Sequence, residues 1–391
     1  MIFKKNSFLP YGRHSISRSD IKKVIKTLKS EFITQGPLVP EFERNLSKIV
    51  ASKHTVAVNS GTSALHIACL ALDLKPNEYV WTSPISFVAS SNCALYCGAK
   101  IDFVDINPNT GLIDEDLLEE KLKKASLQNK LPKILIPVHL AGTSCNMEKI
   151  YKLSREFGFK IIEDASHALG AKYKNKPVGN CKFSDITVFS FHPVKMITTG
   201  EGGAATTNNQ VLLEKMRKLR THGITKDSTE FSYKEEGPWH YEQNLLGFNY
   251  RLNDIQAALG ISQLERLKKI VSKRNKLLNF YKKISQDINI TFLGIPEDCL
   301  SSVHLAIIKL NNFNPDLHKI IFEKMRERNI GVQLHYIPIH LHPFYRGIGF
   351  NKGDFPNSER YAKNSFSIPI YTELEKTNQI RVINALKELI E

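Results

Sequence analysis

The chain has 391 residues, of which 42% are hydrophobic and 24% charged, as in ordinary globular proteins. Its length predicts about two domains, and no apolar run reaches the roughly 18 residues that predict a membrane span. The net charge is +15, but the lysines and arginines are spread over amphipathic patterns and form no basic block interleaved with aromatics. We therefore predict neither nucleic-acid nor membrane binding.

The N-terminal stretch has lysines without a following apolar segment, so no signal peptide is expected. The six cysteines are scattered along the chain, and no two of them form a CxxC motif. This distribution favours a protein of a reducing compartment. Together these features predict a cytoplasmic protein.

Short β-branched runs alternate with helical patterns between about residues 52 and 207. The expected strands are 53–60, 78–83, 99–106, 133–140, 159–166, 185–191 and 202–208, and the expected helices are 62–74, 87–98 and 147–157. This alternation predicts an α/β fold with a mostly parallel sheet. Ligands of such sheets bind at the carboxyl ends of the strands.

The pattern changes after residue 208. A helix is expected at 211–223, a polar, aromatic stretch follows, and a long amphipathic helix is expected at 253–285. The last third predicts a strand at 301–310, a helix at 315–329, a proline-rich aromatic loop and a final helix. We expect a large α/β domain over residues 1–260 and a smaller α+β domain over residues 261–391.

The segment NSGTSAL follows the first expected strand. Gly61 permits a tight turn, and Thr62 can either cap the next helix or bind an anion. Free amide groups and the helix dipole suit a phosphate at such a turn. A simple helix cap is the alternative.

The segment EDASHALG places Glu163 and Asp164 at the end of an apolar strand. A carboxylate there is costly unless a cation meets it. One interpretation is a cap for the next turn, and the other is a partner for a bound cation or protonated heterocycle.

The segment SFHPVKMITTGEGG holds Lys195 among apolar residues. An apolar surrounding lowers a lysine pKa toward the range in which the neutral amine is a nucleophile. A structural lysine is the alternative. The glycines that follow could let the chain pass close to a cofactor.

A phosphate turn, an aspartate at a strand end and a Schiff-base lysine are together what pyridoxal 5′-phosphate (PLP) requires. Asp164 would keep the pyridine nitrogen protonated, and Lys195 would hold the aldehyde carbon. Phe87, at another expected strand end, could cover the face of the ring.

The chain resembles the DegT/StrS family of PLP-dependent sugar aminotransferases of fold type I, from about residue 9 to beyond residue 371. The segments that carry the resemblance are NSGTSAL, EDASHALGA, FSDITVFSFHPVKMITTGEGG and GFNYRLNDIQAALG. It implies that Lys195 forms the Schiff base and moves protons, that Asp164 pairs with the pyridine nitrogen, and that His167 lies beside the ring hydroxyl.

The resemblance also implies how the rest of the cofactor is held. Gly61, Thr62 and Ser190 would bind the phosphate, and Phe87 would stack on the ring. Asn249 would reach the phosphate of the neighbouring subunit's cofactor, which implies a homodimer with its active sites at the interface.

Within the family, the segments PYGRHSIS, SPISFVASSNCALYCGA and VQLHYIPIHLHPFYR are similar to a subgroup of pseudaminic acid biosynthesis, although His14 stands where glutamine is expected. This similarity implies transfer of the amino group of L-glutamate to C4 of a UDP-linked 4-keto-6-deoxy sugar. Tyr11, Arg251, His335 and Tyr336 are candidate substrate contacts. The alternatives are another UDP- or dTDP-linked 4-keto sugar, or a non-catalytic relative that binds a sugar nucleotide.

Two further groups have less specific patterns. His335, His340 and His342 could suggest zinc, but they lie in a proline-rich loop without a thiol, so we predict no metal site. Trp239 and Tyr241 could contact a sugar nucleotide or pack at an interface.

Overall fold

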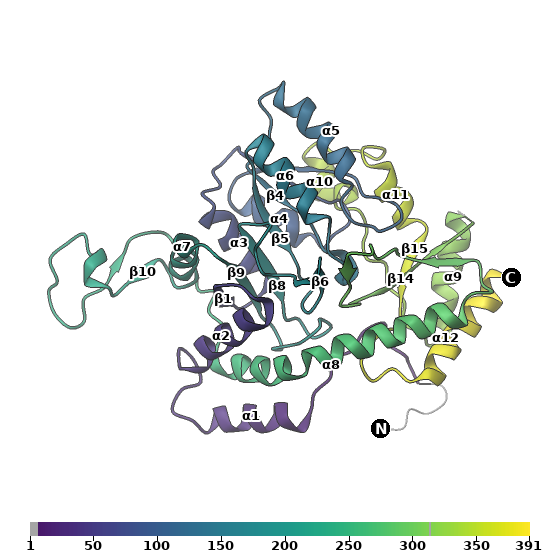
Figure 1. Ribbon diagram of the computed structural model, residues 1–391, viewed down its shortest axis with the longest axis horizontal. Helices are drawn as coiled ribbons and strands as arrows, with labels where there is room; N and C mark the ends of the chain where they lie inside the picture. The colour runs from purple at the N-terminus through teal and green to yellow at the C-terminus, as the bar shows by residue number, and fades with distance from the viewer. Residues whose placement is uncertain (1–6, 313) are drawn as a thin grey trace.

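The computed structural model describes residues 7–312 and 314–391 (Figure 1). Its centre is a seven-stranded sheet with the strand order β1-β9-β8-β5-β4-β2-β3. The strands are β1 (His54–Val58), β2 (Tyr79–Thr82), β3 (Lys100–Phe103), β4 (Ile134–Ile136), β5 (Lys160–Asp164), β8 (Ile186–Ser190) and β9 (Gly203–Thr207). All seven lie within the ranges predicted from the sequence.

Strands β3, β2, β4, β5 and β8 are parallel, and β9 runs antiparallel to both β8 and β1. The predicted α/β class with a mostly parallel sheet is confirmed. The exception has a local cause, because the connection from β8 to β9 contains no helix that could return the chain to the same edge of the sheet. This connection, residues 191–202, carries Lys195.

Helices pack against both faces of the sheet (Figure 1). Consecutive residues of β8 show this: Val188 packs in one core with α3 and α4, and Phe189 packs in another with α2 and α8. A strand buried on both faces is mostly apolar, and in β8 Ile186, Val188 and Phe189 are buried apolar residues. The helices of this part are α1 (Arg18–Leu28), α2 (Leu38–Val50), α3 (Gly61–Ala71), α4 (Ala89–Tyr96), α5 (Glu115–Ser126), α6 (Met147–Phe157) and α7 (Gln210–Arg220).

Helix α8 (Asp254–Ile284) begins beside the large sheet and runs to the C-terminal part of the chain (Figure 1). Its first turn has a capping box formed by Asn253 and Gln256. Its early residue Ile261 packs with α2, and its late residue Leu277 packs in the C-terminal core. The division into domains at residue 260 falls inside this helix and stays a prediction.

The C-terminal part contains a three-stranded antiparallel sheet in the order β12-β14-β15. Its elements are β12 (Ile290–Phe292), β14 (Ala306–Leu310), α9 (Pro315–Glu327), α10 (Pro343–Gly347), α11 (Pro356–Ala362), β15 (Ser365–Ile368) and α12 (Lys376–Ile390). The sheet, α9 and α12 bury one apolar cluster that also takes in Leu9 from the N-terminal segment.

Two small sheets complete the fold. Strands β6 (Lys172–Tyr173), β7 (Lys176–Pro177) and β13 (Cys299–Leu300) form one, and β10 (Ile224–Thr225) and β11 (Glu242–Gln243) form the other. The β10–β11 segment projects from the body of the molecule (Figure 1). Of the helices in the described part of the chain, none combines the length and apolar character needed to cross a membrane.

Candidate active site

A cavity of about 520 Å³ opens where β5, β8 and the first turn of α3 meet the segment around residue 335. The carboxyl ends of the parallel strands β5 and β8 form its floor, as expected for such a sheet. Ten residues singled out from the sequence line it: Tyr11, Gly61, Thr62, Phe87, Asp164, His167, Ser190, Lys195, His335 and Tyr336. These residues come from segments more than 300 residues apart in the chain.

The first turn of α3 forms one end of the cavity. The Ser60 side chain accepts the Ser63 amide (3.0 Å), and the first helical bond runs from the Ala64 amide to the Ser60 carbonyl (3.1 Å). The amides of Gly61 and Thr62 precede that bond, so the helix itself gives them no acceptor. With the Thr62 hydroxyl they make a donor set that suits a phosphate.

Gly61 also lies against the end of β8. A Cβ atom at this position would come within 3.0 Å of Ser190 Cβ and 3.4 Å of Ser190 Oγ. A larger residue would therefore push the turn away from Ser190. Glycine at position 61 lets the turn and the Ser190 hydroxyl face the same point in the cavity.

One of the glycines after Lys195, Gly203, lies against the turn that begins α3. A Cβ atom at Gly203 would lie 2.4 Å from the Ser60 carbonyl oxygen and 2.6 Å from the Gly61 amide nitrogen. Gly203 thus allows β9 to approach the backbone of the α3 turn. The close approach that Gly203 permits is therefore between two segments of the chain.

The two carboxylates at the end of β5 have different surroundings, because successive strand residues face opposite sides of a sheet. Asp164 is buried and lines the cavity, where its oxygens accept the Ser90 hydroxyl (2.6 Å) and the Ser166 amide (3.1 Å). Glu163 instead bonds to His139 (2.8 Å).

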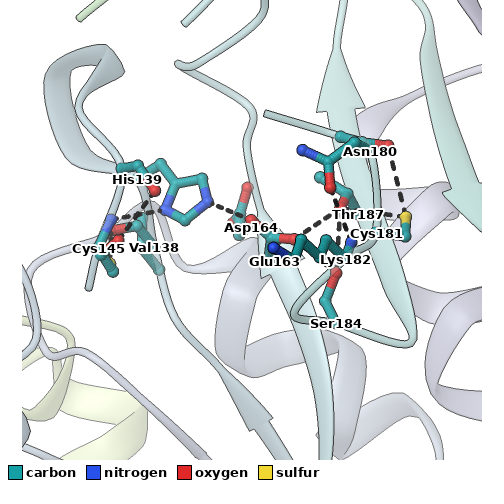
Figure 2. A network of polar contacts seen from close by, with 12 residues as sticks. Val138, His139, Cys145, Glu163, Asp164, Asn180, Cys181, Lys182, Ser184 and Thr187 are labelled. Atoms are coloured by element: carbon teal, nitrogen blue, oxygen red, sulfur yellow. Dashed lines mark hydrogen bonds and ion pairs between the residues drawn. The ribbon is translucent and has the colours of Figure 1, made fainter. Parts of the chain in front are cut away.

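Glu163 belongs to a closed polar network (Figure 2). Besides His139, the hydroxyls of Ser184 and Thr187 donate to it. Burial by itself would raise the pKa of Glu163, but His139 and the hydroxyls outweigh it, and the net pKa lies below its ordinary value. Glu163 is thus a satisfied structural carboxylate. Asp164 accepts an amide of the next turn, as the first interpretation predicts, and it also faces the cavity, as the second requires.

Lys195 lies on the loop after β8, where its amide bonds to the His192 carbonyl (2.9 Å). Its side chain is half-buried in the cavity wall, and no carboxylate in the described residues forms an ion pair with it. Loss of hydration lowers the pKa of Lys195 from 10.5 to about 8, although the Asp164 carboxylate opposes the shift. A substantial fraction of this amine is therefore neutral near physiological pH.

Histidine and tyrosine side chains form the wall opposite the α3 turn. His167 Nε2 lies 3.0 Å from the Tyr336 hydroxyl, and the His304 ring packs on His167 with 4.4 Å between ring centroids. Burial, and then the nearby Lys195, lower the pKa of His335 to about 3. These imidazoles are neutral, so Lys195 is the main source of positive charge in the cavity.

Four candidate site residues lie away from the cavity lining: Asn249, predicted to contact a cofactor phosphate, and Arg251, Trp239 and Tyr241, candidates for substrate contact. Asn249 and Arg251 belong to a strand-like segment beside β1, where their backbones pair with Thr221 and Val58. Trp239 and Tyr241 lie in the projecting β10–β11 segment and are 73% and 56% exposed. None of these four residues lines the cavity of its own chain.

The histidines of the proline-rich loop have separate partners. His335 Nδ1 bonds to the Ser367 hydroxyl (2.8 Å), and His340 Nε2 bonds to Glu359 (3.1 Å). Across residues 7–312 and 314–391, no three His, Cys, Asp or Glu side chains are grouped in a way that could hold a metal ion. Of the loop histidines, His335 is the one that lines the cavity.

Sequence reasoning missed several residues of the cavity. Ser86 lines the cavity and bonds to Ser90 (2.6 Å), which holds Asp164 from the first turn of α4. The spacing of these serines gave no helix-face signal, because Ser86 precedes the helix. His304 also had no signal, because it is a single polar residue before an apolar strand. Its preceding residue, Val303, has φ +56, a rare value for a β-branched residue.

The residues present fit PLP. The α3 turn and Ser190 provide donors for a phosphate, Asp164 provides an anion for a protonated ring nitrogen, and the neutral fraction of Lys195 can condense with an aldehyde. All three lie in one cavity.

Comparison with known proteins gives the same result. A model of the DegT/DnrJ/EryC1/StrS aminotransferase family matches residues 14–387. The chain is 38% identical to UDP-4-amino-4,6-dideoxy-N-acetyl-beta-L-altrosamine transaminase of Campylobacter jejuni over 98% of both chains.

Two solved structures are similar over almost the whole chain. PseC of Helicobacter pylori, an aminotransferase involved in pseudoaminic acid biosynthesis, has a TM-score of 0.89 at 32% identity and covers 98% of this chain and 99% of its own. The PLP form of the putative sugar aminotransferase Spr1654 of Streptococcus pneumoniae has a TM-score of 0.88 at 29% identity, with 98% of each chain covered.

The fold and the cavity thus define a PLP-dependent aminotransferase of fold type I. More specifically, the chain belongs to the DegT/DnrJ/EryC1/StrS aminotransferase family. The resemblance found from the sequence and the predicted cofactor are both confirmed.

Proposed function

We propose that this enzyme transfers the amino group of L-glutamate to C4 of UDP-2-acetamido-2,6-dideoxy-β-L-arabino-hex-4-ulose. The product would serve pseudaminic acid biosynthesis and hence the glycosylation of flagellin or surface polysaccharide. The observation that carries the proposal is the full-length similarity to the C. jejuni transaminase, in a chain whose cavity brings together Gly61, Thr62, Asp164, Ser190 and Lys195.

Each cavity residue takes a role that its contacts support. Gly61, Thr62 and Ser190 hold the phosphate, since they converge at the α3 turn. Asp164 pairs with the ring nitrogen, and Ser90 fixes the direction of its carboxylate. When bound, PLP supplies an aldehyde that accepts the amino group and a ring that withdraws electrons from the reacting carbon.

The remaining roles concern the ring and the proton transfers. Phe87 is 59% exposed at the cavity, which leaves its face free to stack on the ring, and His167 lies beside the ring hydroxyl. Lys195 holds the cofactor covalently. Once released, its Nζ takes the proton from Cα of glutamate and later delivers one to C4 of the sugar.

The sugar nucleotide would enter past Tyr11, which lines the cavity. A second depression, of about 400 Å³, shares Val194 with the cavity and is lined by Phe8, Arg13 and His14. Basic side chains next to an aromatic ring suit a diphosphate joined to a nucleobase. The keto sugar would then reach inward to Tyr336 and His335.

The substrate is tested by incubating the holoenzyme with L-glutamate labelled with ¹⁵N and a panel of UDP- and dTDP-linked 4-keto-6-deoxy sugars. Mass spectrometry and NMR of the product are expected to show ¹⁵N at C4 of the UDP-linked L-arabino 4-ketose. Amination of another sugar in the panel would replace the proposed substrate, and amination of none would point to a non-catalytic relative.

We further propose that the enzyme is a homodimer in which Asn249 binds the phosphate in the partner's active site. Support comes from the position of Asn249 outside the cavity of its own chain. Mixed dimers of Lys195→Ala and Asn249→Ala subunits should regain activity, because one site of each hybrid then has both residues intact. Mixtures no more active than the separate variants would contradict the shared site.

We place the enzyme in the cytoplasm. All six cysteines are free, and four of them are buried, as is usual for proteins of a reducing compartment.

A further inference from the structure

The hydrogen bond between His167 and Tyr336 has a defined direction. The Ala141 amide donates to His167 Nδ1 (3.3 Å), so Nδ1 carries a lone pair and no proton. The proton of the neutral imidazole is then on Nε2, which lies 3.0 Å from the Tyr336 hydroxyl oxygen. His167 is therefore the donor, and Tyr336 accepts.

The surroundings of His167 keep this arrangement in place. The side chain is buried, and burial lowers its pKa well below the ordinary value, so the ring does not gain a second proton. The Ala141 amide belongs to a tight turn in which Ala141 and Gly142 have φ +57 and +97. On the other side, the His304 ring packs against His167 at 4.4 Å.

Tyr336 consequently keeps its own proton to donate. In the part of the chain that the structure describes, its hydroxyl makes no hydrogen bond other than the one from His167. Burial, followed by the nearby Asp164 carboxylate, raises the pKa of Tyr336, so the hydroxyl stays protonated. Its ring lines the cavity, 6.3 Å from the ring of Phe87. A protonated donor without a protein acceptor takes its acceptor from what fills the cavity, which is water or a ligand atom.

We propose that Tyr336 donates a hydrogen bond to the C4 keto oxygen of the sugar substrate, and that His167 is the positioning residue that directs this donor. The inference rests on the proposed function. A neutral hydroxyl suits a neutral carbonyl, whereas a carboxylate would be better matched by a cation. The bond polarises the carbonyl for attack by the amino group, and the oxygen later leaves as water.

The location of Tyr336 fits the reacting end of the substrate. Lys195 is close enough to His335, the preceding residue, and to His167 to affect the pKa of both. Tyr336 follows His335 directly, bonds to His167 and lines the same cavity as Lys195.

The test measures the two half-reactions of the Tyr336→Phe variant separately, one with glutamate and one with the keto sugar. Each is followed in a single turnover by the absorbance of the bound cofactor. We expect the half-reaction with the keto sugar to slow by about 10- to 100-fold. The half-reaction with glutamate should stay within about threefold, and the resting absorbance spectrum should not shift. Tyr345→Phe is the matched control, because its hydroxyl bonds to Ser91 and Asn92 outside the cavity.

His167→Leu should slow the same half-reaction, and Tyr336→Phe should add little further loss when the two are combined. His167→Gln, whose amide can accept from Ala141 and donate to Tyr336, should restore most of the rate. Four results for Tyr336→Phe would overturn the inference: equal slowing of both half-reactions, slowing with glutamate alone, a shift of the resting spectrum, or no effect on either half-reaction. A wild-type enzyme that aminates no sugar in the panel overturns the proposed function instead, and with it this inference.

Discussion

Lys195→Ala is expected to lower turnover to background and to abolish the visible absorbance of the covalently bound cofactor. Among residues 7–312 and 314–391, Lys195 is the one lysine that lines the cavity. Its replacement therefore removes both the covalent attachment and the proton-transfer group. The measurements are the absorbance spectrum of the purified variant with added PLP and its rate with glutamate as donor.

The exposed Lys22 on α1 provides the control. Lys22→Ala removes the same charge from the surface and should leave both the spectrum and the rate unchanged. If Lys195→Ala kept its absorbance and its turnover, the assignment of this residue would be wrong.

Asp164→Asn should lower kcat by about 30-fold or more while the protein stays folded. The amide keeps an oxygen for Ser90 but carries no negative charge to hold a proton on the ring nitrogen. Losing one partner of a buried charge pair costs about 2–5 kcal/mol, and each 1.36 kcal/mol is about tenfold in rate. Steady-state kinetics with saturating PLP measure the effect.

Glu163→Gln is the matched comparison, since Glu163 precedes Asp164 and faces the other side of the sheet. It should lower the melting temperature, because His139 and two hydroxyls lose a charged partner in a buried network (Figure 2). The kcat of the folded variant should stay within about threefold of wild type. If Glu163→Gln and Asp164→Asn lost equal amounts of kcat, the assignment of a structural role to Glu163 and a cofactor-binding role to Asp164 would be wrong.

Much of the large domain could be predicted from local patterns. Helix α6 has the predicted bounds, and each strand of the central sheet lies inside its predicted range. These elements can be recognised from short stretches of sequence, because the spacing of apolar residues and the flanking turn residues indicate them. Asp164, Lys195 and the Gly61 turn could be singled out for the same reason, because each follows a recognisable strand.

What could not be predicted depends on contacts between distant segments. His167 and Tyr336 are 169 positions apart, and no pattern in either segment shows that one donates to the other. His304 gave no signal, although it packs against His167. The antiparallel course of β9 depends on a connection without a helix, and the role of Gly203 depends on the backbone of Ser60.

The central claim is that the cavity between β5, β8 and α3 binds PLP covalently through Lys195. The most direct measurement is reduction of the holoenzyme with borohydride, followed by digestion and mass spectrometry of the peptides. A pyridoxyl group on Lys195 alone is the predicted result. A label on a different lysine, or no labelled peptide from a yellow and active preparation, would contradict it.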